Sequence, residues 1–344
     1  MKRSIYRELK RILKEGQDVY IITITKAKEE KLIGNKILKN DKELIFEDSI
    51  NKEIYINIAE SIEFNEGGKN ITVNDDIEVF IEHVGAKPSL VICGAGHIAL
   101  PLCNLAKMLD FTVTIIDERE EFANRDRLTE ADNIICLDFE SALEKVDFNN
   151  NSYFVIVTRG HKYDKNCLEI ILKNNFKYVG MIGSKAKVVT VVKDLIKGGF
   201  TEEIIKKIHT PIGIKIGAQT PAEIAVSIAA EIISVKNESN IYYIDEEILN
   251  KINEKDEAKV LVTIMDKKGS SPRGAGAKML VFRDESFIGT IGGGIVENAA
   301  IKKAIEAIEK EKSFVETYDL SNSKAAKLGM ACGGTIKVLF EYIK

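Results

Sequence analysis

The middle of the chain alternates short apolar runs with segments whose apolar residues recur at helical spacing. This pattern extends from Ser89 to about Lys236. Strands that alternate with helices form a parallel sheet, because each helix returns the chain to the starting edge of the sheet. The pattern therefore predicts an α/β fold with a doubly wound parallel sheet. The apolar runs are LVICG, TVTIID, NIICL, YFVIVT and YVGMIG.

A small α+β pattern lies on each side of this region. The first has an amphipathic helix around Ile5 to Leu13 and strands that end with Ile77 to Val84. The second follows the polar linker Lys236 to Asn240 and has a helix near Glu246 to Ile252, further strands and a long helix from Val296 to Lys310. Such composition shifts favour domain boundaries. We therefore expect three parts, at 1–85, 86–236 and 245–344.

The two outer parts share a weak internal repeat. Each begins with a helix, then DVYIITITKAK matches KVLVTIMDKKG, and IEVFIEHV matches IKVLFEYI at the end. We interpret them as two copies of one domain. The first copy lacks the glycine-rich segments of the second, so we assign it a scaffolding or dimerisation role. The alternative is that two unrelated small units share a generic strand pattern.

Composition narrows the functional classes. The chain has 49 Lys and Arg against 53 Asp and Glu, a net charge of −4, which gives no electrostatic reason to expect nucleic acid or a membrane surface as partner. No apolar stretch approaches the roughly 20 residues of a membrane-spanning helix. The start, MKRSIYRELK, lacks the apolar segment of a signal peptide. We expect a soluble, cytoplasmic protein.

The cysteines do not form a metal knuckle or a disulfide framework, because they are odd in number and widely spaced. Cys93, Cys103, Cys136 and Cys167 stand in apolar runs and are predicted to be core thiols. Cys332 differs, since Gly333 and Gly334 follow it and would leave its sulfur beside exposed backbone.

A dinucleotide-binding signature opens the central region. The turn GAGHIA follows the strand LVIC and begins a helix, as a Rossmann fold requires for a pyrophosphate at a helix N-terminus. Asp117 ends the next strand, where an acid would bind a ribose and favour NAD or an adenine nucleotide over NADP. The adjacent Arg119 weakens that preference. The alternative is a Rossmann scaffold that has lost its ligand. The turn contributes Gly94, Gly96, His97 and Ala99 as candidate cofactor-binding residues.

Two further polar segments follow later strands of the predicted sheet. Arg159, His161 and Asp164 follow the fourth strand and could hold an anion or move a proton. The alternative is that Arg159 and Asp164 pair and brace a loop. Gly183, Ser184 and Lys185 follow the fifth strand, where they suit either a phosphate site or an ordinary helix N-cap.

The C-terminal part carries three glycine-rich turns, at 269–276, 289–294 and 330–334. The first also contains Arg273 and leads to Lys278, so it suits an extended anionic ligand. The second leads into the long helix and offers free amides at a helix N-terminus. The alternative is a set of tight turns without a ligand. The candidate ligand-binding residues here are Ser271, Arg273, Gly276, Gly292, Gly293 and Gly294.

Other catalytic signatures are absent from the sequence. There is no zinc-type ligand set, no GxSxG elbow, no Walker loop and no HExxH pair. The residues therefore give no support to a classical hydrolase or a metal-dependent enzyme.

Taken together, these motifs resemble the XdhC/CoxI family of xanthine dehydrogenase accessory proteins. The resemblance runs through VICGAGHIALPL, TIIDEREEFANRDR, VTRGHKYD, YVGMIGSKAK and PIGIKIGAQTPAEIAVSIAAEI, and again through GSSPRGAGAKMLV, GTIGGGIVE and GMACGGTIKVLFE. It implies a factor that binds molybdenum cofactor (molybdopterin), supports its sulfuration with a cysteine desulfurase and delivers it to an apo-molybdenum hydroxylase. Because thiolate is a soft ligand, we predict that Cys332 contacts the molybdenum centre.

The order of the parts departs from the family pattern, which usually places the GSSPR unit before the Rossmann unit. Here that unit follows, and the degenerate copy at 1–85 stands in front. Independently of this order, two other functions stay open. One is an NAD(P)-dependent oxidoreductase that uses Arg159, His161 and Asp164. The other is a nucleotide-sensing interaction protein, and a homodimer is compatible with each.

Overall fold

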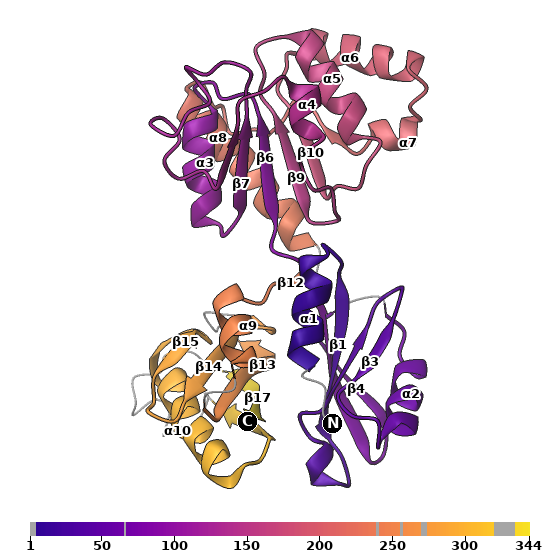
Figure 1. Cartoon of the computed structure of the whole chain (residues 1–344), viewed down its shortest axis with the longest axis vertical. Helices are drawn as coiled ribbons and strands as arrows, with labels where there is room; N and C mark the ends of the chain where they lie inside the picture. Colours follow the sequence, from indigo (N-terminus) through magenta and orange to yellow (C-terminus); the bar gives the residue numbers. More distant parts are fainter. Residues whose placement is uncertain (1–4, 65–66, 239–240, 255–256, 270–273, 320–333) are drawn as a thin grey trace. The chain divides into compact units, whose positions relative to one another are not determined.

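The computed structural model describes residues 5–64, 67–238, 241–254, 257–269, 274–319 and 334–344. The chain forms two compact units (Figure 1). One unit, here called the Rossmann unit, is Ala86–Ser239. The other, here called the repeat unit, joins Met1–Gly85 to Asn240–Lys344. The two ends of the chain thus form one body, and the central region forms another.

The Rossmann unit contains the predicted parallel sheet. Its strand order is β11-β10-β9-β6-β7-β8, and each pair of neighbours in this order runs parallel. The direction of winding reverses between β6 and β9, which creates the crevice where open α/β sheets bind ligands. The predicted doubly wound sheet is therefore confirmed. Its strands are β6 (Ser89–Cys93), β7 (Thr112–Ile116), β8 (Asn133–Ile135), β9 (Ser152–Ile156), β10 (Tyr178–Met181) and β11 (Ile208–His209).

Helices cover both faces of this sheet, as Figure 1 shows. Apolar residues of α3 (Ala99–Met108) and α8 (Pro221–Glu238) form the core on one face. The other face packs against α4 (Phe139–Leu143), α5 (His161–Ile171), α6 (Lys185–Lys197) and α7 (Glu202–Ile205). Apolar strands buried on both faces are expected for a parallel sheet.

One prediction about the thiols is wrong. Cys93, Cys103 and Cys167 are buried as expected, but Cys136 is exposed. It directly follows the short edge strand β8 and lies in the loop before α4, so its apolar neighbours in sequence do not carry it into the core.

The repeat unit contains two halves with the same order of elements. The N repeat comprises α1 (Ile5–Lys14), β1 (Val19–Lys26), the 3-10 helix η1 (Glu30–Leu32), β2 (Lys36–Lys39), β3 (Leu44–Phe46), α2 (Lys52–Glu60), β4 (Lys69–Asn74) and β5 (Ile77–Val84). The C repeat comprises α9 (Glu246–Asn253), β13 (Lys259–Gly269), β14 (Lys278–Phe282), β15 (Phe287–Gly289), α10 (Gly294–Lys310), β16 (Phe314–Asp319) and β17 (Gly334–Ile343).

Strand pairing is also the same in the two repeats. The orders β3-β2-β1-β5 and β15-β14-β13-β17 correspond, β4 pairs with β5 as β16 pairs with β17, and all these pairs are antiparallel. Even the irregularity recurs, after Ile24 in β1 and after Ile264 in β13. An extra strand, β12 (Ile241–Tyr242), pairs in parallel with β5. A generic strand pattern does not explain a shared bulge, so the two halves are copies of one fold.

Each repeat covers one face of its sheet with its own helix and shares the other face. Apolar residues under α2 form the core of the N repeat, and those under α10 form the core of the C repeat. A third cluster joins α1 and α9 with strands of both sheets, and it includes Leu9, Ile21, Ile252 and Leu261. Neither repeat can bury this shared face alone, so the two depend on each other for folding.

Two buried ion pairs cross from one repeat to the other. The Lys36 Nζ lies 2.7 Å from a Glu341 carboxylate oxygen, and the Lys278 Nζ lies 2.6 Å from one of Glu82. Each lysine also donates to a threonine of its own repeat, Thr23 at 2.9 Å and Thr263 at 3.2 Å. None of the four charged side chains is more than 9% exposed. The correspondence of these pairs shows that the repeats face each other symmetrically.

In the part of the chain that the structure describes, no helix combines the length and the apolar character needed to cross a membrane.

We predict that breaking one of the crossed pairs destabilises the protein strongly. Lys278→Met leaves the Glu82 carboxylate buried without its cation, which should cost about 3–5 kcal/mol. Replacing both partners, as in Lys278→Met with Glu82→Leu, should recover most of that loss because no buried charge remains. Urea unfolding followed by circular dichroism measures both. Lys310→Ala, which removes an exposed ion pair with Glu306, is the matched control and should change little. A single variant as stable as its double variant would contradict this role.

Candidate functional site

The glycine turn after β6 lies at the point where the sheet reverses. Gly94 has a φ of +112°, and its N–H donates to the Ile116 carbonyl at 2.8 Å. A Cβ at Gly94 would lie 2.5 Å from the Val157 carbonyl oxygen, which no side chain tolerates. Gly94 therefore has a structural role, because only glycine allows this turn and the close approach to the loop after β9.

Gly96 differs, since a Cβ built there would meet nothing within 4 Å. The space in front of it is open, as a ligand that approaches the backbone requires. Ala99 is completely buried where α3 packs on the sheet, while His97 is exposed. Of the four residues of the signature, Gly96 and His97 thus face space that a ligand could occupy, and Gly94 and Ala99 serve the fold.

Asp117 ends β7 beside this turn, and its carboxylate is fully engaged. It accepts the Ala95 N–H at 2.8 Å, the Arg119 N–H at 3.1 Å, and the Arg119 guanidinium through Nε and Nη2, both at 2.8 Å. Burial would raise the pKa of Asp117, but the hydrogen bonds from Arg119 and Ala95 outweigh it and lower the pKa. Asp117 is therefore charged and already bound within the protein.

A second arginine stands near this carboxylate. The Arg119 guanidinium lies 3.9 Å from the centre of the Phe122 ring, and the Arg127 guanidinium lies 4.9 Å from it. Arg127 also donates to the Ala95 carbonyl at 2.9 Å, within the glycine turn itself. Two guanidinium groups are thus fixed beside the glycine turn. Sequence reasoning considered Arg119 but assigned no role to Arg127, which ends the segment TIIDEREEFANRDR.

The residues predicted after β9 bind separate partners. Asp164 is completely buried, where it accepts from the Thr158 hydroxyl at 2.7 Å and pairs with Lys187. Arg159 is exposed and binds Glu118 at 2.5 Å and the Tyr163 hydroxyl at 3.1 Å. His161 is exposed at the start of α5. The structure therefore places Asp164 in a structural ion pair and leaves Arg159 and His161 at the rim.

The segment after β10 acts as a helix cap. The Ser184 side chain accepts the Lys187 N–H at 3.3 Å, as an N-cap residue does. Gly183 is close to the Lys187 side chain, 2.9 Å from where a Cβ would stand. Lys185 begins α6. A phosphate here would have to compete with the serine for the first amides of the helix.

In the C repeat, the described glycines differ in what surrounds them. Gly276 has a φ of +85°, and a Cβ there would lie 2.3 Å from the Tyr242 ring, so a side chain rather than a ligand occupies that space. Gly293 and Gly294 also have positive φ, and neither would bring a Cβ within 4 Å of another atom. Gly292 has a φ of +123°. Gly274 and the turn before α10 thus both leave open space beside the backbone.

A carboxylate of the protein already occupies part of this turn. Glu297 accepts the Ile291 N–H at 3.1 Å, the Gly293 N–H at 3.2 Å and the Thr290 hydroxyl at 2.5 Å. An anionic ligand at this turn would therefore need a cation beside it to offset the repulsion from Glu297.

Lys278 does not serve as that cation, contrary to the interpretation from sequence, because it is buried against Glu82 and Thr263. Ser271, Arg273 and Cys332 lie outside the described residues. Within the described part of the chain, no group of three or more His, Cys, Asp or Glu side chains could hold a metal ion.

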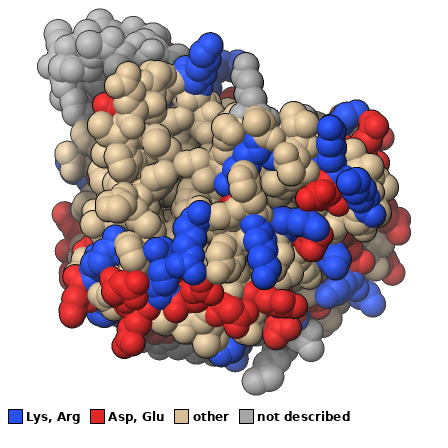
Figure 2. Space-filling model, turned by 90° about the horizontal axis from the view of Figure 1, so that it is seen from above, with Lys and Arg blue, Asp and Glu red and all other residues tan. Residues whose placement is uncertain are grey.

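Figure 2 shows the face at which the strands of the Rossmann sheet end. Basic and acidic side chains are interspersed there, beside a broad area without charged residues. Selectivity for an anion at this face must therefore come from particular arginines and not from a general positive field.

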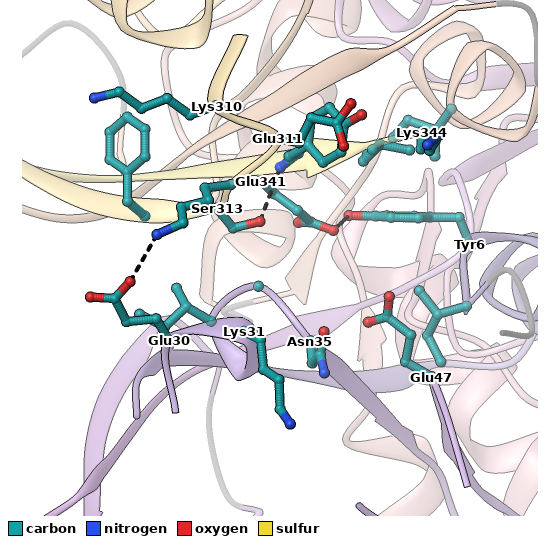
Figure 3. A pocket seen from close by; sticks show the side chains of 18 of the residues that line it. Tyr6, Glu30, Lys31, Asn35, Glu47, Lys310, Glu311, Ser313, Glu341 and Lys344 are labelled. Atoms are coloured by element: carbon teal, nitrogen blue, oxygen red, sulfur yellow. Dashed lines mark hydrogen bonds and ion pairs between the residues drawn. The ribbon is translucent and has the colours of Figure 1, made fainter. Parts of the chain in front are cut away.

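The sequence did not predict a cleft of about 1410 Å³ in the repeat unit. Figure 3 shows its lining, in which Glu30, Lys31 and Asn35, from η1 and the segment before β2, lie opposite Lys310, Glu311 and Ser313, at the end of α10 and just after it. Tyr6 donates to Glu341 at 2.5 Å, and Lys312 donates to Glu30 at 3.1 Å. Lys312 and Glu30 thus neutralise each other within the lining of the cleft.

Comparison with protein families matches two segments of the chain. Residues 90–232 match the model described as the XdhC Rossmann domain. Residues 253–319 match the model described as the XdhC and CoxI family. The first segment contains the glycine turn and Asp117, and the second contains the turn before α10.

Two curated proteins are similar over nearly half of the chain. One, named "Uncharacterized protein YqeB", is from Escherichia coli K12 and is 32% identical over 162 residues, which are 47% of this chain and 30% of that protein. The other, from Bacillus subtilis, is named as a probable subunit of xanthine dehydrogenase. It is 32% identical over 158 residues, 46% of each chain. This chain therefore covers less than half of each relative.

A solved structure shares the fold. The crystal structure of a xanthine dehydrogenase from Bacillus halodurans matches with a TM-score of 0.52 and 24% identity over 67% of each chain. At that identity the likeness supports the fold alone.

We predict that Gly96→Val blocks nucleotide binding without harming the fold. The valine has space in the protein but stands where a pyrophosphate must approach, so the affinity for an adenine dinucleotide should fall at least about tenfold. Isothermal titration calorimetry measures the affinity, and thermal melting checks the fold. Gly94→Ala should instead lower the melting temperature, because its methyl group meets the Val157 carbonyl. Equal affinities in wild type and Gly96→Val would refute the pocket.

We also predict a pH dependence from Asp117. Because its pKa is lowered below the ordinary value of 3.8, its charged form stabilises the protein above that pH, and the stabilisation is lost as the pH falls through the lowered pKa. Asp117→Asn lacks this titration. Wild type should thus be more stable than the variant at about pH 6 and should lose that advantage progressively as the pH falls below 3.8. A pH-independent difference in urea unfolding would contradict the assignment.

Proposed function

The chain belongs to the XdhC/CoxI family, and we propose that it is an accessory factor for a molybdenum hydroxylase such as xanthine dehydrogenase. In this proposal it binds molybdenum cofactor as cargo, assists the sulfuration of that cofactor and inserts it into the apo-enzyme. The presence of both family segments in one chain is the observation that carries the proposal. The name of the Bacillus subtilis relative supports the kind of partner.

The open turn before α10 supports the position of the cargo. Gly293 and Gly294 leave their backbone uncovered, which suits a bulky anionic ligand at a helix N-terminus. Since Glu297 already holds two amides of this turn, the cargo would need Arg273 as the opposing cation. Ser271 would add a hydroxyl donor, and Cys332 would add a soft thiolate for the metal.

The proposed partners follow from the chemistry of the task. Sulfuration needs a sulfur donor, for which a cysteine desulfurase is the proposed source. Insertion needs an apo-molybdenum hydroxylase as acceptor. The Rossmann unit would bind an adenine dinucleotide, such as NAD(P), at Gly96, where open space meets the start of α3.

The second candidate is an NAD(P)-dependent oxidoreductase, which the complete Rossmann strand order and the open Gly96 favour. The side chains predicted to act on a substrate do not favour an oxidoreductase. Asp164 is buried in an ion pair, and Arg159 is bound to Glu118 and Tyr163. Of the three residues in that predicted cluster, His161 at the rim is the one left for proton transfer.

The small molecules that co-purify with the protein distinguish the two functions. A pterin fluorophore together with molybdenum, measured by mass spectrometry of the metal, supports the accessory factor. A nicotinamide cofactor without molybdenum, together with reduction or oxidation of that cofactor in an activity assay, supports the oxidoreductase and rejects the accessory role.

We predict that Cys332→Ala lowers bound molybdenum and the activation of a co-expressed hydroxylase, at least about tenfold in each, because the soft ligand is lost. The melting temperature should be nearly unchanged, since a small residue replaces a small residue. Cys136→Ala, which removes an exposed thiol of the Rossmann unit, is the control. It should change neither the bound molybdenum nor the activation of the hydroxylase. Full molybdenum content and full activation in a folded Cys332→Ala protein would remove the ligand role.

A further inference from the structure

We propose that the Rossmann crevice selects an adenine dinucleotide with a phosphate on the ribose 2′ oxygen, and that Arg119 is the residue that recognises this phosphate. The inference rests on the proposed nucleotide binding at Gly96. It reverses the expectation from sequence, in which Asp117 favours an unphosphorylated ribose.

Asp117 has no capacity left to bind a ribose. A carboxylate offers about four acceptor sites, and Asp117 accepts four hydrogen bonds, one from the Ala95 N–H and three from Arg119. The side chain is only 3% exposed. A ribose 2′-hydroxyl that donates to Asp117 would have to break the bidentate pair with Arg119, in which each bond is 2.8 Å long.

Arg119, in contrast, keeps N–H donors that a ligand could use. A guanidinium carries five N–H groups, and the pair with Asp117 uses Nε and one hydrogen of Nη2. The remaining hydrogens are on the side of the group that the carboxylate does not cover. The arginine side chain is 23% exposed, so solvent reaches it. The position is suitable as well, because the residues just after the second strand of a Rossmann sheet contact the ribose.

The Arg119 and Arg127 guanidinium groups are held in fixed positions. The Arg119 guanidinium is held from one side by Asp117 and lies 3.9 Å from the centre of the Phe122 ring. Arg127 contacts the same ring and donates to the carbonyls of Ala95 and Phe122. A planar cation fixed in this way loses little conformational entropy when it binds a phosphate.

The charges around the site favour an anion. Arg119 neutralises Asp117, and Arg127 adds a further positive charge beside the glycine turn. Glu118 also acts on Arg119, but Arg159 binds it at 2.5 Å. Glu121 is exposed and opposes the phosphate through solvent, where screening is strong. The named arginines and acids are equal in number, so the attraction for an anion comes from the fixed guanidinium groups and not from a net positive charge.

The test compares NADP⁺ with NAD⁺ by isothermal titration calorimetry on the full chain at low salt. The proposal expects wild type to bind NADP⁺ at least about tenfold more tightly than NAD⁺. Arg119→Ala should weaken NADP⁺ binding by about that factor and leave NAD⁺ binding unchanged or improved, because Asp117 then becomes free to accept from the ribose. Added salt should reduce the preference of wild type, since it screens the phosphate.

Two further variants separate recognition from folding. Arg119→Lys keeps a positive charge next to Asp117 and should retain part of the preference. Arg125→Ala removes a nearby arginine that donates to the Ala131 and Asp132 carbonyls, and it should keep the full preference. Thermal melting shows whether each variant is folded.

The outcomes distinguish this inference from the proposed nucleotide site. If NAD⁺ binds as tightly as NADP⁺, or if Arg119→Ala weakens both equally, Arg119 does not recognise a phosphate, and only this inference fails. If neither nucleotide binds to wild type, both the site and its selectivity are rejected.

Discussion

The two lysine–glutamate pairs that cross between the repeats determine how the repeat unit is built. A buried charge is tolerated only beside its partner, so Lys36 requires Glu341 and Lys278 requires Glu82 from the opposite end of the chain. The N repeat is therefore part of the same body as the C repeat. It supplies the Glu82 carboxylate that pairs with Lys278. The N repeat lacks the glycine-rich segments but is still required for the fold of the repeat unit, because it supplies one side of the shared core.

In the Rossmann unit, the equivalent constraint is the contact between the glycine turn and the loop after β9. A Cβ at Gly94 would overlap the Val157 carbonyl, while one at Gly96 would meet only open space. Two glycines of one motif thus have different tasks. The first lets the backbone pass close to its neighbour, and the second leaves the backbone accessible. Since Gly94 is fixed by packing, its presence argues for the fold, and the accessibility of Gly96 argues for a ligand.

Much of the fold could be predicted from the sequence, because burial on both faces makes the strands of a parallel sheet nearly continuous apolar runs. The same reasoning failed for Cys136, whose apolar neighbours form an edge strand only three residues long. The repeat was visible in two matched segments, but the ion pairs that join its halves were not, since Lys36 and Glu341 are 305 positions apart and sequence spacing says nothing about such contacts. Likewise, the order of Asp117 and Arg119 in sequence could not show that one neutralises the other.

Both candidate sites share a physical feature that sequence motifs do not reveal: a carboxylate of the protein already binds amides that a ligand would use. Asp117 holds the Ala95 N–H at the Rossmann turn, and Glu297 holds the Ile291 and Gly293 N–H groups before α10. Such a carboxylate stabilises the turn in the absence of ligand, but it also repels an anion. An anionic ligand can then bind only where a cation offsets the carboxylate. Arg119 has that position in the first site, and the second site needs one from the loop that contains Arg273. Under these two proposals, arginine side chains decide selectivity at both turns, and the glycines provide the space in which they act.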